Sequence, residues 1–331
     1  MTFDIISIGD ATIDNFFFFH DVHVTCKLRK QDCVLEIPFG TKLPVDKYVR
    51  TVAGNAANNA VGSARLGLKT AFYSVLGDDP SGHEIKKSIL AEGISGKYIQ
   101  NVKKQATNIS AVLSVKGERT ILVYHVERNY SLPLFEKTDW IYLTSMGPLN
   151  NSLKKLHIQI ELYLKKNPQV KLGFNPGTHQ LKMRKEGLLP LFKRTEVLFV
   201  NKEEAELICE KKGGMKIEFL LQELYSFGIK IVVITDGEKG SYIFDGKKMF
   251  SLPIFPARVI ERTGCGDSYA TAFICALQNN NSISEAMKWG TFNAASVLGE
   301  IGPEKGLLTK KQMERYLRKN KKFEPKEKFL K

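Results

Sequence analysis

Short apolar segments typical of β-strands alternate with segments of helical periodicity over most of the chain. The expected strands are residues 4–9, 70–76, 140–144, 170–174, 197–200 and 229–235. The expected helices are residues 56–66, 82–92, 152–166, 267–278, 284–298 and 310–318. Because parallel strands need crossover helices, this alternation predicts an α/β fold with a mostly parallel sheet covered on both faces.

Two insertions interrupt the alternation. Residues 15–50 hold short alternating or apolar pieces separated by turn residues, and residues 108–125 have the pattern of a hairpin around 115–118. Neither insertion has enough strands to form a core alone, so we interpret both as one β-sheet lid. The expected parts are an α/β domain from residues 1–14, 51–106 and 127–305, a lid from residues 15–50 and 107–126, and a basic C-terminal helix and tail from residues 306–331.

The formal net charge of +14 would suit a nucleic-acid-binding protein. Residues 304–331 alone hold eleven Lys or Arg and four Asp or Glu, which is half of the excess. Charge concentrated in one terminal segment is typical of a solvated helix face followed by a frayed end. We therefore expect no nucleic-acid partner.

The chain has no segment that approaches the roughly 18 apolar residues of a membrane span, and its first residues lack a signal-peptide pattern. Its five cysteines are odd in number, and none is spaced as CxxC. This argues against a disulfide framework and a zinc site. We expect a cytoplasmic protein with no membrane partner.

The sharpest local signal is the segment E-R-T-G-C-G-D at residues 261–267, which runs directly into a helix. Its two glycines let backbone N–H groups approach an anion, and the helix N-terminus adds unpaired donors, so the segment is suited to bind phosphate. Asp267 would either cap this helix or accept a proton from an attacking hydroxyl. The residues alone leave both roles open.

This segment resembles the C-terminal signature of the ribokinase-like (pfkB) carbohydrate kinases, D-T-x-G-A-G-D-x-F. Residues 53–67 resemble the family's N-terminal signature, a Gly-Gly followed by Asn and a helix that ends in Ala-Arg-Leu-Gly. Further similar segments occur in the family's order at residues 9–14, 77–82, 175–177, 201–204 and 235–240. The resemblance implies a ribokinase-like three-layer α/β/α fold with a small β-sheet lid.

The resemblance also implies roles for individual residues. Asp267 would deprotonate the acceptor hydroxyl, and the backbone of Gly264, Cys265 and Gly266 would stabilise the transferred phosphoryl group. The expected residues for the acceptor are Asp14, Gly54, Asn55 and Asn58. Those for the nucleotide are Asn201, Thr235, Gly237, Gly240 and Asn293. Asn201 and Glu204 would organise Mg²⁺ indirectly, through its waters.

Three residues of the segment depart from the family's commonest pattern. Cys265 is small enough to replace alanine, so we interpret it as a steric substitute. In many relatives an acid at the position of Glu261 helps to bind a monovalent cation such as K⁺. The longer Glu261 beside the bulky Arg262 leaves that cofactor an open question, and Arg262 itself is a possible source of positive charge.

The expected function is that of an ATP- and Mg²⁺-dependent kinase that phosphorylates a hydroxymethyl group of a sugar. A nucleoside kinase of the same fold is the first alternative, and a catalytically inactive sensor is another. A sugar-phosphate kinase is also possible and would need Lys42, Lys47 or Arg50 in the pocket. A nicotinamide dehydrogenase is disfavoured, because the first strand is not followed by G-x-G-x-x-G.

The lid carries four consecutive phenylalanines at residues 16–19. Exposed aromatic strands seldom remain in contact with water. We therefore expect a homodimer through the lid, with this run as the contact.

Overall fold

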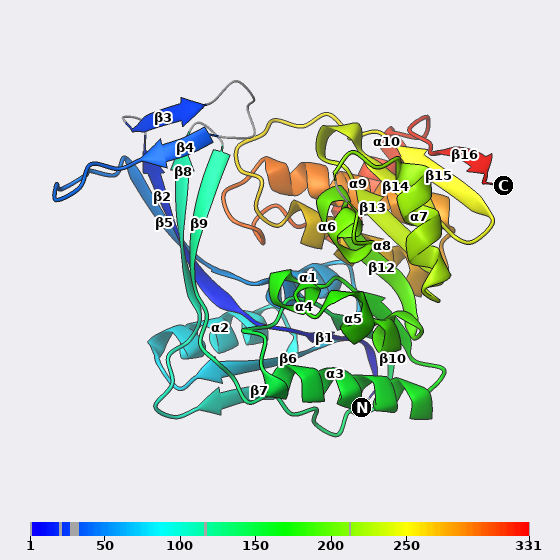
Figure 1. Ribbon diagram of the computed structural model, residues 1–331, viewed down its shortest axis with the longest axis horizontal. Helices are drawn as coiled ribbons and strands as arrows, with labels where there is room; N and C mark the ends of the chain where they lie inside the picture. The colour runs from blue at the N-terminus through cyan, green and yellow to red at the C-terminus, as the bar shows by residue number, and fades with distance from the viewer. Residues whose placement is uncertain (1, 20–21, 27–32, 116–117, 212, 331) are drawn as a thin grey trace.

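The computed structural model describes residues 2–19, 22–26, 33–115, 118–211 and 213–330. Its large sheet has the strand order β16-β15-β14-β13-β12-β11-β10-β1-β6-β7 (Figure 1). The strands from β7 to β13 in this order are all parallel, whereas β14, β15 and β16 add antiparallel pairs at one edge. The parallel strands are β1 Phe3–Ile8, β6 Thr70–Gly77, β7 Ser95–Val102, β10 Thr138–Leu143, β11 Lys171–Phe174, β12 Thr195–Asn201 and β13 Ile231–Thr235, and the antiparallel ones are β14 Ser241–Phe244, β15 Lys248–Leu252 and β16 Lys326–Phe329. The expected mostly parallel α/β fold is confirmed.

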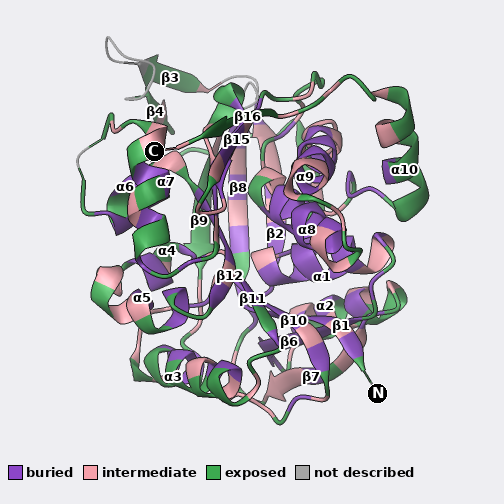
Figure 2. Ribbon diagram, turned by 90° about the vertical axis from the view of Figure 1, so that its right-hand side faces the viewer, coloured by how far each residue is buried: buried purple, intermediate pink, exposed green. Residues whose placement is uncertain are grey.

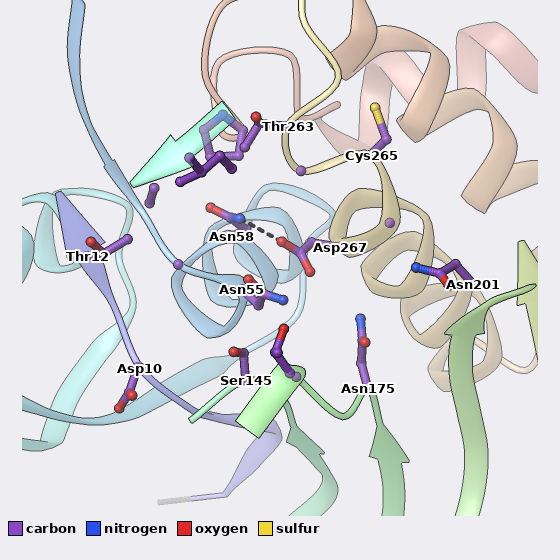
Figure 3. A pocket seen from close by; sticks show the side chains of 18 of the residues that line it. Asp10, Thr12, Asn55, Asn58, Ser145, Asn175, Asn201, Thr263, Cys265 and Asp267 are labelled. Atoms are coloured by element: carbon purple, nitrogen blue, oxygen red, sulfur yellow. Dashed lines mark hydrogen bonds between the residues drawn. The ribbon is translucent and has the colours of Figure 1, made fainter. Parts of the chain in front are cut away.

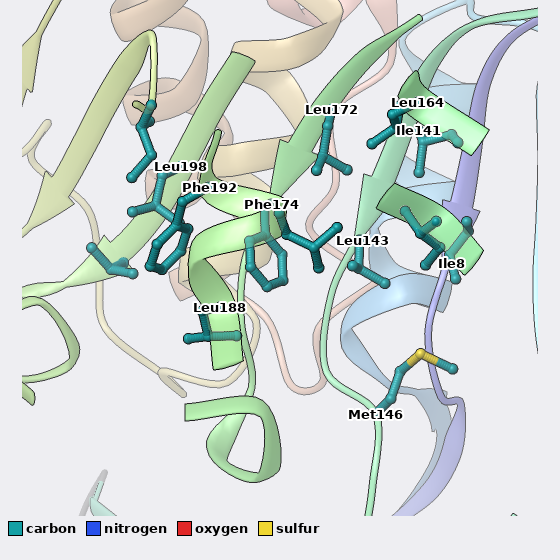
Figure 4. Packing of buried hydrophobic residues seen from close by; sticks show 14 of the residues in the cluster. Ile8, Ile141, Leu143, Met146, Leu164, Leu172, Phe174, Leu188, Phe192 and Leu198 are labelled. Atoms are coloured by element: carbon teal, nitrogen blue, oxygen red, sulfur yellow. The ribbon is translucent and has the colours of Figure 1, made fainter. Parts of the chain in front are cut away.

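Helices cover both faces of this sheet because its strands are apolar on both sides. In β10, Ile141 and Leu143 belong to one core, whereas Trp140 and Tyr142 belong to the other. Figure 4 shows the first core, and Figure 2 shows how burial concentrates between the layers. On this first face lie α3 Asn151–Lys166, α4 Thr178–Leu181, α5 Arg184–Phe192, α6 Lys202–Ile208 and α7 Ile217–Ser226. On the opposite face lie α1 Asn55–Arg65, α2 Pro80–Ala91, α8 Cys265–Gln278, α9 Ile283–Leu298 and α10 Lys310–Lys319.

The lid is a second, four-stranded sheet that rises from one end of the large sheet (Figure 1). Its strands are ordered β5-β2-β8-β9, with bounds Lys47–Ala53, Thr12–Phe19, Ile109–Val115 and Glu118–Tyr124. The expected hairpin is β8 and β9, although its turn at 116–117 lies outside the described residues. Strands β2 and β5 extend beyond both ends of the expected insertion 15–50, so they connect the lid directly to the large domain.

The phenylalanine run in β2 is mostly covered, contrary to the expectation of an exposed contact. Phe16 is fully buried and Phe19 nearly so, because β2 lies between β5 and β8 in the lid. Exposed apolar side chains of the four-stranded sheet include Tyr48 on β5, Ile109 on β8, and four consecutive residues of the edge strand β9, Ile121, Leu122, Val123 and Tyr124. The interpretation of residues 16–19 as the contact surface is therefore wrong for Phe16 and Phe19.

A disulfide in the lid corrects the expectation of free cysteines. Cys33 is disulfide-bonded, whereas Cys209, Cys265 and Cys275 are free. Cys33 begins β4 Cys33–Glu36, which pairs with β3 His23–Cys26 in a two-stranded sheet. The sequence spacing did not indicate a disulfide, because no CxxC motif marks it.

In the described part of the chain, every helix is too short or too polar to cross a membrane. The cytoplasmic location expected from the sequence stays a prediction.

The C-terminal segment is not a frayed end. After α10, residues of β16 pair with β15 at the edge of the large sheet, and Lys328 forms an ion pair with Glu218. Phe323 packs against the rings of Phe255 and Phe292, with centroid distances of 5.4 and 5.5 Å. The charged sequence did not predict this strand, because the unpaired backbone groups of β15 supply its pairing partner.

We expect Phe323→Ala to lower the free energy of unfolding by about 1 to 3 kcal/mol, because the ring leaves an aromatic cluster. Phe329→Ala is the matched control, since that ring is 74% exposed, and we expect a change within about 0.5 kcal/mol. Urea unfolding followed by circular dichroism measures both. Equal midpoints for the two variants would mean that the segment contributes no stability.

Candidate active site

A cavity of about 480 Å³ lies where the lid meets the carboxyl ends of the parallel strands (Figure 3). The N-termini of α1 and α8 border it, and the lid contributes Ser110, Arg119, Ile121 and Val123. This is the usual place for a ligand in an open α/β sheet. The cavity brings together most of the expected site residues: Asp14, Gly54, Asn55, Asn58, Asn201, Glu204, Thr235, Gly264, Cys265, Gly266 and Asp267.

Glycines allow the two helix N-termini to reach the cavity. Gly54 has φ +108°, and a Cβ there would lie 2.7 Å from Ala11 Cα. Gly264 has φ +82°, and a Cβ there would lie 2.4 Å from Pro303 Cβ. A Cβ on Gly266, in contrast, would meet no atom within 4 Å. Because no side chain caps α8, the first N–H groups of this helix remain available to an anion in that open space.

Asp267 points across the cavity instead of capping its own helix (Figure 3). Its Oδ2 accepts a hydrogen bond of 2.8 Å from Asn58 Nδ2, although 209 residues separate the two in the sequence. Asp267 as a whole residue is only 7% exposed. Burial raises its pKa to about 7; the nearby Glu204 raises it further, and the bond from Asn58 lowers it. Asp267 is therefore suited to exchange a proton near neutral pH.

Two buried acceptor oxygens face the lid side of the cavity. Asp14 Oδ1 and Asn58 Oδ1 have no hydrogen-bond partner among the described residues. Burial raises the pKa of Asp14 to about 6, while a hydrogen bond from Ser110 and the charge of Arg119 oppose that rise. Unpaired buried oxygens are costly to a folded protein, so these two atoms are suited to accept hydrogen bonds from ligand hydroxyls.

Asn201 and Glu204 begin α6 as a capping box. Asn201 Oδ1 accepts from the Glu204 N–H, and Glu204 Oε2 accepts from the Asn201 N–H, both at 2.8 Å. Glu204 Oε1 has no partner among the described residues. The described part of the chain has no cluster of three His, Cys, Asp or Glu that could hold a metal ion. Both residues line the cavity, so their side-chain oxygens are suited to accept hydrogen bonds from the waters of an ion bound there.

Three expected nucleotide residues lie away from the cavity. Asn293 is fully buried: its Nδ2 donates to Ser268 O at 2.8 Å, and its Oδ1 accepts from Leu308 N at 2.9 Å. Asn293 therefore does not reach the cavity, contrary to its expected nucleotide contact, because both ends of its amide are occupied by backbone groups. Gly237 and Gly240 form the turn after β13 and do not line the cavity, although Thr235 at the end of that strand does.

Sequence reasoning missed other residues of the site. Asp10 lines the cavity, and its carboxylate accepts hydrogen bonds from Tyr130 OH and Gly147 N. These bonds join the start of the lid to the segment between β9 and β10, through Tyr130, and to the loop after β10, through Gly147. Burial raises the pKa of Asp10 to about 7. Arg119 and His125 on the lid also line the cavity. Asp10 lies within the family-like segment 9–14, where only Asp14 was assigned to the site, whereas no local motif surrounds Arg119 or His125.

The basic residues required by a sugar-phosphate kinase lie elsewhere. Lys42, Lys47 and Arg50 do not line the cavity. Arg50 forms an ion pair of 2.7 Å with Glu84, and the ammonium of Lys47 lies over the Phe18 ring. The cationic side chains that do line it are Arg119, which faces Glu261, and Arg262, which faces Glu238.

Comparisons with known proteins agree with this arrangement. Residues 24–310 match the family model described as pfkB family carbohydrate kinase. The chain is 25% identical over 304 residues to a ribokinase of Haemophilus influenzae, covering 86% of this chain and 95% of that protein. It is 27% identical over 331 residues to a 5-dehydro-2-deoxygluconokinase of Bacillus subtilis, covering 95% and 96%. The fold is similar to that of an Arabidopsis thaliana ribokinase complexed with ribose and ATP, with a TM-score of 0.77, 20% identity, and coverage of 96% and 99%. The chain therefore belongs to the pfkB family of carbohydrate kinases.

Proposed function

We propose that this kinase transfers the γ-phosphoryl group of ATP to a hydroxymethyl group of an uncharged sugar, with Asp267 as the general base. The observation that carries the proposal is the position of Asp267. Its buried carboxyl, with a pKa near 7, lies at the N-terminus of α8 beside the open space over Gly266. A base and an anion site thus adjoin one another, as phosphoryl transfer to a hydroxyl requires.

In this proposal each group has a distinct task. Asp267 takes the proton of the acceptor hydroxyl, and Asn58 holds the carboxylate in place. The N–H groups of the Gly264–Gly266 turn stabilise charge on the transferred group. Mg²⁺ neutralises charge on the phosphates when bound, and Asn201 and Glu204 hold its waters. Thr235 lines the same end of the cavity and is assigned to the nucleotide.

The charges around the cavity favour an uncharged acceptor. Its lining includes the carboxylates of Asp10, Asp14, Glu204 and Asp267. The two lining guanidinium groups already face carboxylates of the protein, Glu261 and Glu238. An acceptor with a phosphate would therefore meet uncompensated negative charge. The lid residues Ile121 and Val123 are aliphatic, which suits a sugar better than a stacked nucleobase.

A panel of sugars and nucleosides with ATP and Mg²⁺, read out as ADP release, tests the assignment. We expect turnover with one or more neutral sugars. Turnover with nucleosides alone would make the chain a nucleoside kinase. No ADP release with any compound of the panel, in the presence of ATP and Mg²⁺, would contradict the proposal.

We expect Asp14→Ala to raise the KM for the acceptor about 10- to 150-fold, because charge-assisted hydrogen bonds to its hydroxyls are lost. The KM for ATP should stay the same. Asp14→Asn keeps the shape of the side chain and loses its charge, so this variant separates the contribution of the charge from that of the hydrogen bonds. Steady-state kinetics with each substrate varied in turn provides the measurement. An unchanged acceptor KM in the Ala variant would remove Asp14 from the site.

We further propose a homodimer through the lid, with β9 as the contact. Along this edge strand, Ile121 and Val123 face the cavity, so the alternating Leu122 and Tyr124 lie on the opposite face, where each is more than half exposed. Edge strands also carry unpaired backbone groups. Light scattering should give a dimer at micromolar concentration for the wild type and a monomer for Leu122→Ser/Tyr124→Ser. Leu134→Ser is the control, since Leu134 is 95% exposed outside the lid. A monomeric wild type would refute the dimer alone.

A further inference from the structure

Glu261 begins the loop that leads to Gly264 and α8, and its carboxylate is buried there. The residue is only 2% exposed. Its oxygens accept from the Thr263 N–H at 2.9 Å and from Thr263 Oγ1 at 2.6 Å. These bonds fix the turn immediately before the expected anion site, but they leave a buried negative charge to be compensated.

The compensating charge comes from the lid. Arg119 on β9 places its Nε 3.6 Å from Glu261 Oε1, and it is the only ion-pair partner of Glu261 among the described residues. Arg262 does not compensate the charge of Glu261, because its guanidinium faces the exposed Glu238 at 3.5 Å instead. Burial raises the pKa of Asp14, and the charge of the Arg119 guanidinium opposes that rise, so one lid side chain acts on both the acceptor carboxylate and the catalytic loop.

A monovalent cation does not fit beside this carboxylate. Both oxygens of Glu261 already accept hydrogen bonds from Thr263, and the Arg119 guanidinium lies next to them, with its Nε 3.6 Å from Oε1. A second cation at that position would be repelled by the first at short range. The residue set therefore disagrees with the monovalent-cation site that the family resemblance implied for this acid.

We propose that the guanidinium of Arg119 takes the place of a monovalent cation at Glu261, so that lid closure supplies the counter-charge of the catalytic loop and the kinase works without K⁺. Arg119 is a positioning residue in this account: it acts through Glu261 and Thr263 on the Gly264–Gly266 turn. This inference rests on the proposed function where it is tested by turnover. The melting-temperature measurement below does not depend on that function.

The first test replaces the salt. At constant ionic strength, kcat and both KM values of the wild type should agree within about twofold in potassium, sodium and choline chloride. The melting temperature, which needs no turnover, should likewise show no rise specific to K⁺. A tenfold higher kcat in potassium, or a melting temperature several degrees higher in potassium alone, would overturn the proposal and leave the kinase assignment intact. Absence of turnover in every salt would instead count against the proposed function.

The second test removes the guanidinium. Arg119→Met should lose about 10- to 100-fold in kcat/KM, and added methylguanidinium should restore part of it, because the small cation can occupy the vacated position. Arg119→Lys, which keeps the charge, should lose less. Arg50→Met is the matched control: it breaks a lid ion pair, with Glu84, that lies away from the cavity, and kcat should not change. Full activity in Arg119→Met, or equal losses in the Met and Lys variants without rescue, would overturn the proposal.

Discussion

Replacing Asp267 with asparagine is expected to lower kcat by about two to four orders of magnitude, the usual contribution of a positioned base. The amide keeps the size of the side chain and its contact with Asn58, so nucleotide affinity should change little. Steady-state kinetics and nucleotide titration measure the two quantities. Turnover close to that of the wild type would show that the carboxyl has no catalytic part.

The pH profile gives an independent check of the same assignment. With the pKa of Asp267 raised to about 7 by burial, kcat/KM of the wild type should fall as the pH drops below that value, since a protonated base cannot accept. The Asn variant should lack this inflection. Asp14 has a pKa of about 6 and is present in both proteins. An inflection near pH 6 should therefore remain in the variant, whereas the one near pH 7 should disappear.

As the pH rises, the stability of the folded protein should fall while its activity increases. The folded protein holds a proton on Asp267 between its unfolded value near 3.8 and about 7, where the unfolded chain does not, so the free energy of unfolding decreases as the pH rises through this range. Asp267→Asn removes the buried charge. We therefore expect its melting temperature at pH 8 to equal or exceed that of the wild type, which also shows that the inactive variant is folded.

Gly264→Ala should lower kcat by about 100- to 1,000-fold, comparable with the loss of a preorganised anion-binding donor. A Cβ at this position lies 2.4 Å from Pro303 Cβ, on a backbone with φ +82°, so the start of α8 must shift away from the cavity. Steady-state kinetics at saturating substrates provides the measurement.

Gly93→Ala is the matched control for this substitution. Gly93 has a similar φ of +74°, yet its Cβ would meet no atom within 4 Å. Both variants should lose about 1 kcal/mol of stability from the backbone conformation, but only Gly264→Ala should lose activity. An active Gly264→Ala enzyme would mean that the turn does not bind the transferred group.

The sequence determined much of the architecture because its signals are local. The alternation of strand and helix patterns predicted the parallel sheet, and the T-G-C-G-D segment predicted a helix from residue 267, two residues after α8 begins at Cys265. Periodicity, glycine conformations and capping preferences extend over a few residues only, so one chain suffices to recognise them. The family resemblance, which short motifs carry, allowed Asp14, Asn58 and Asp267 to be named.

Only the tertiary structure decided which distant groups meet. It joined Asn58 to Asp267 and Arg119 to Glu261, it occupied both ends of the Asn293 amide, and it paired β16 with β15. None of these contacts has a local signal in the sequence. Each one joins residues of different segments, so it depends on how those segments pack against one another. The sequence by itself therefore determined the elements and the chemistry that they carry, whereas packing determined the partner, the burial and hence the pKa of each functional group.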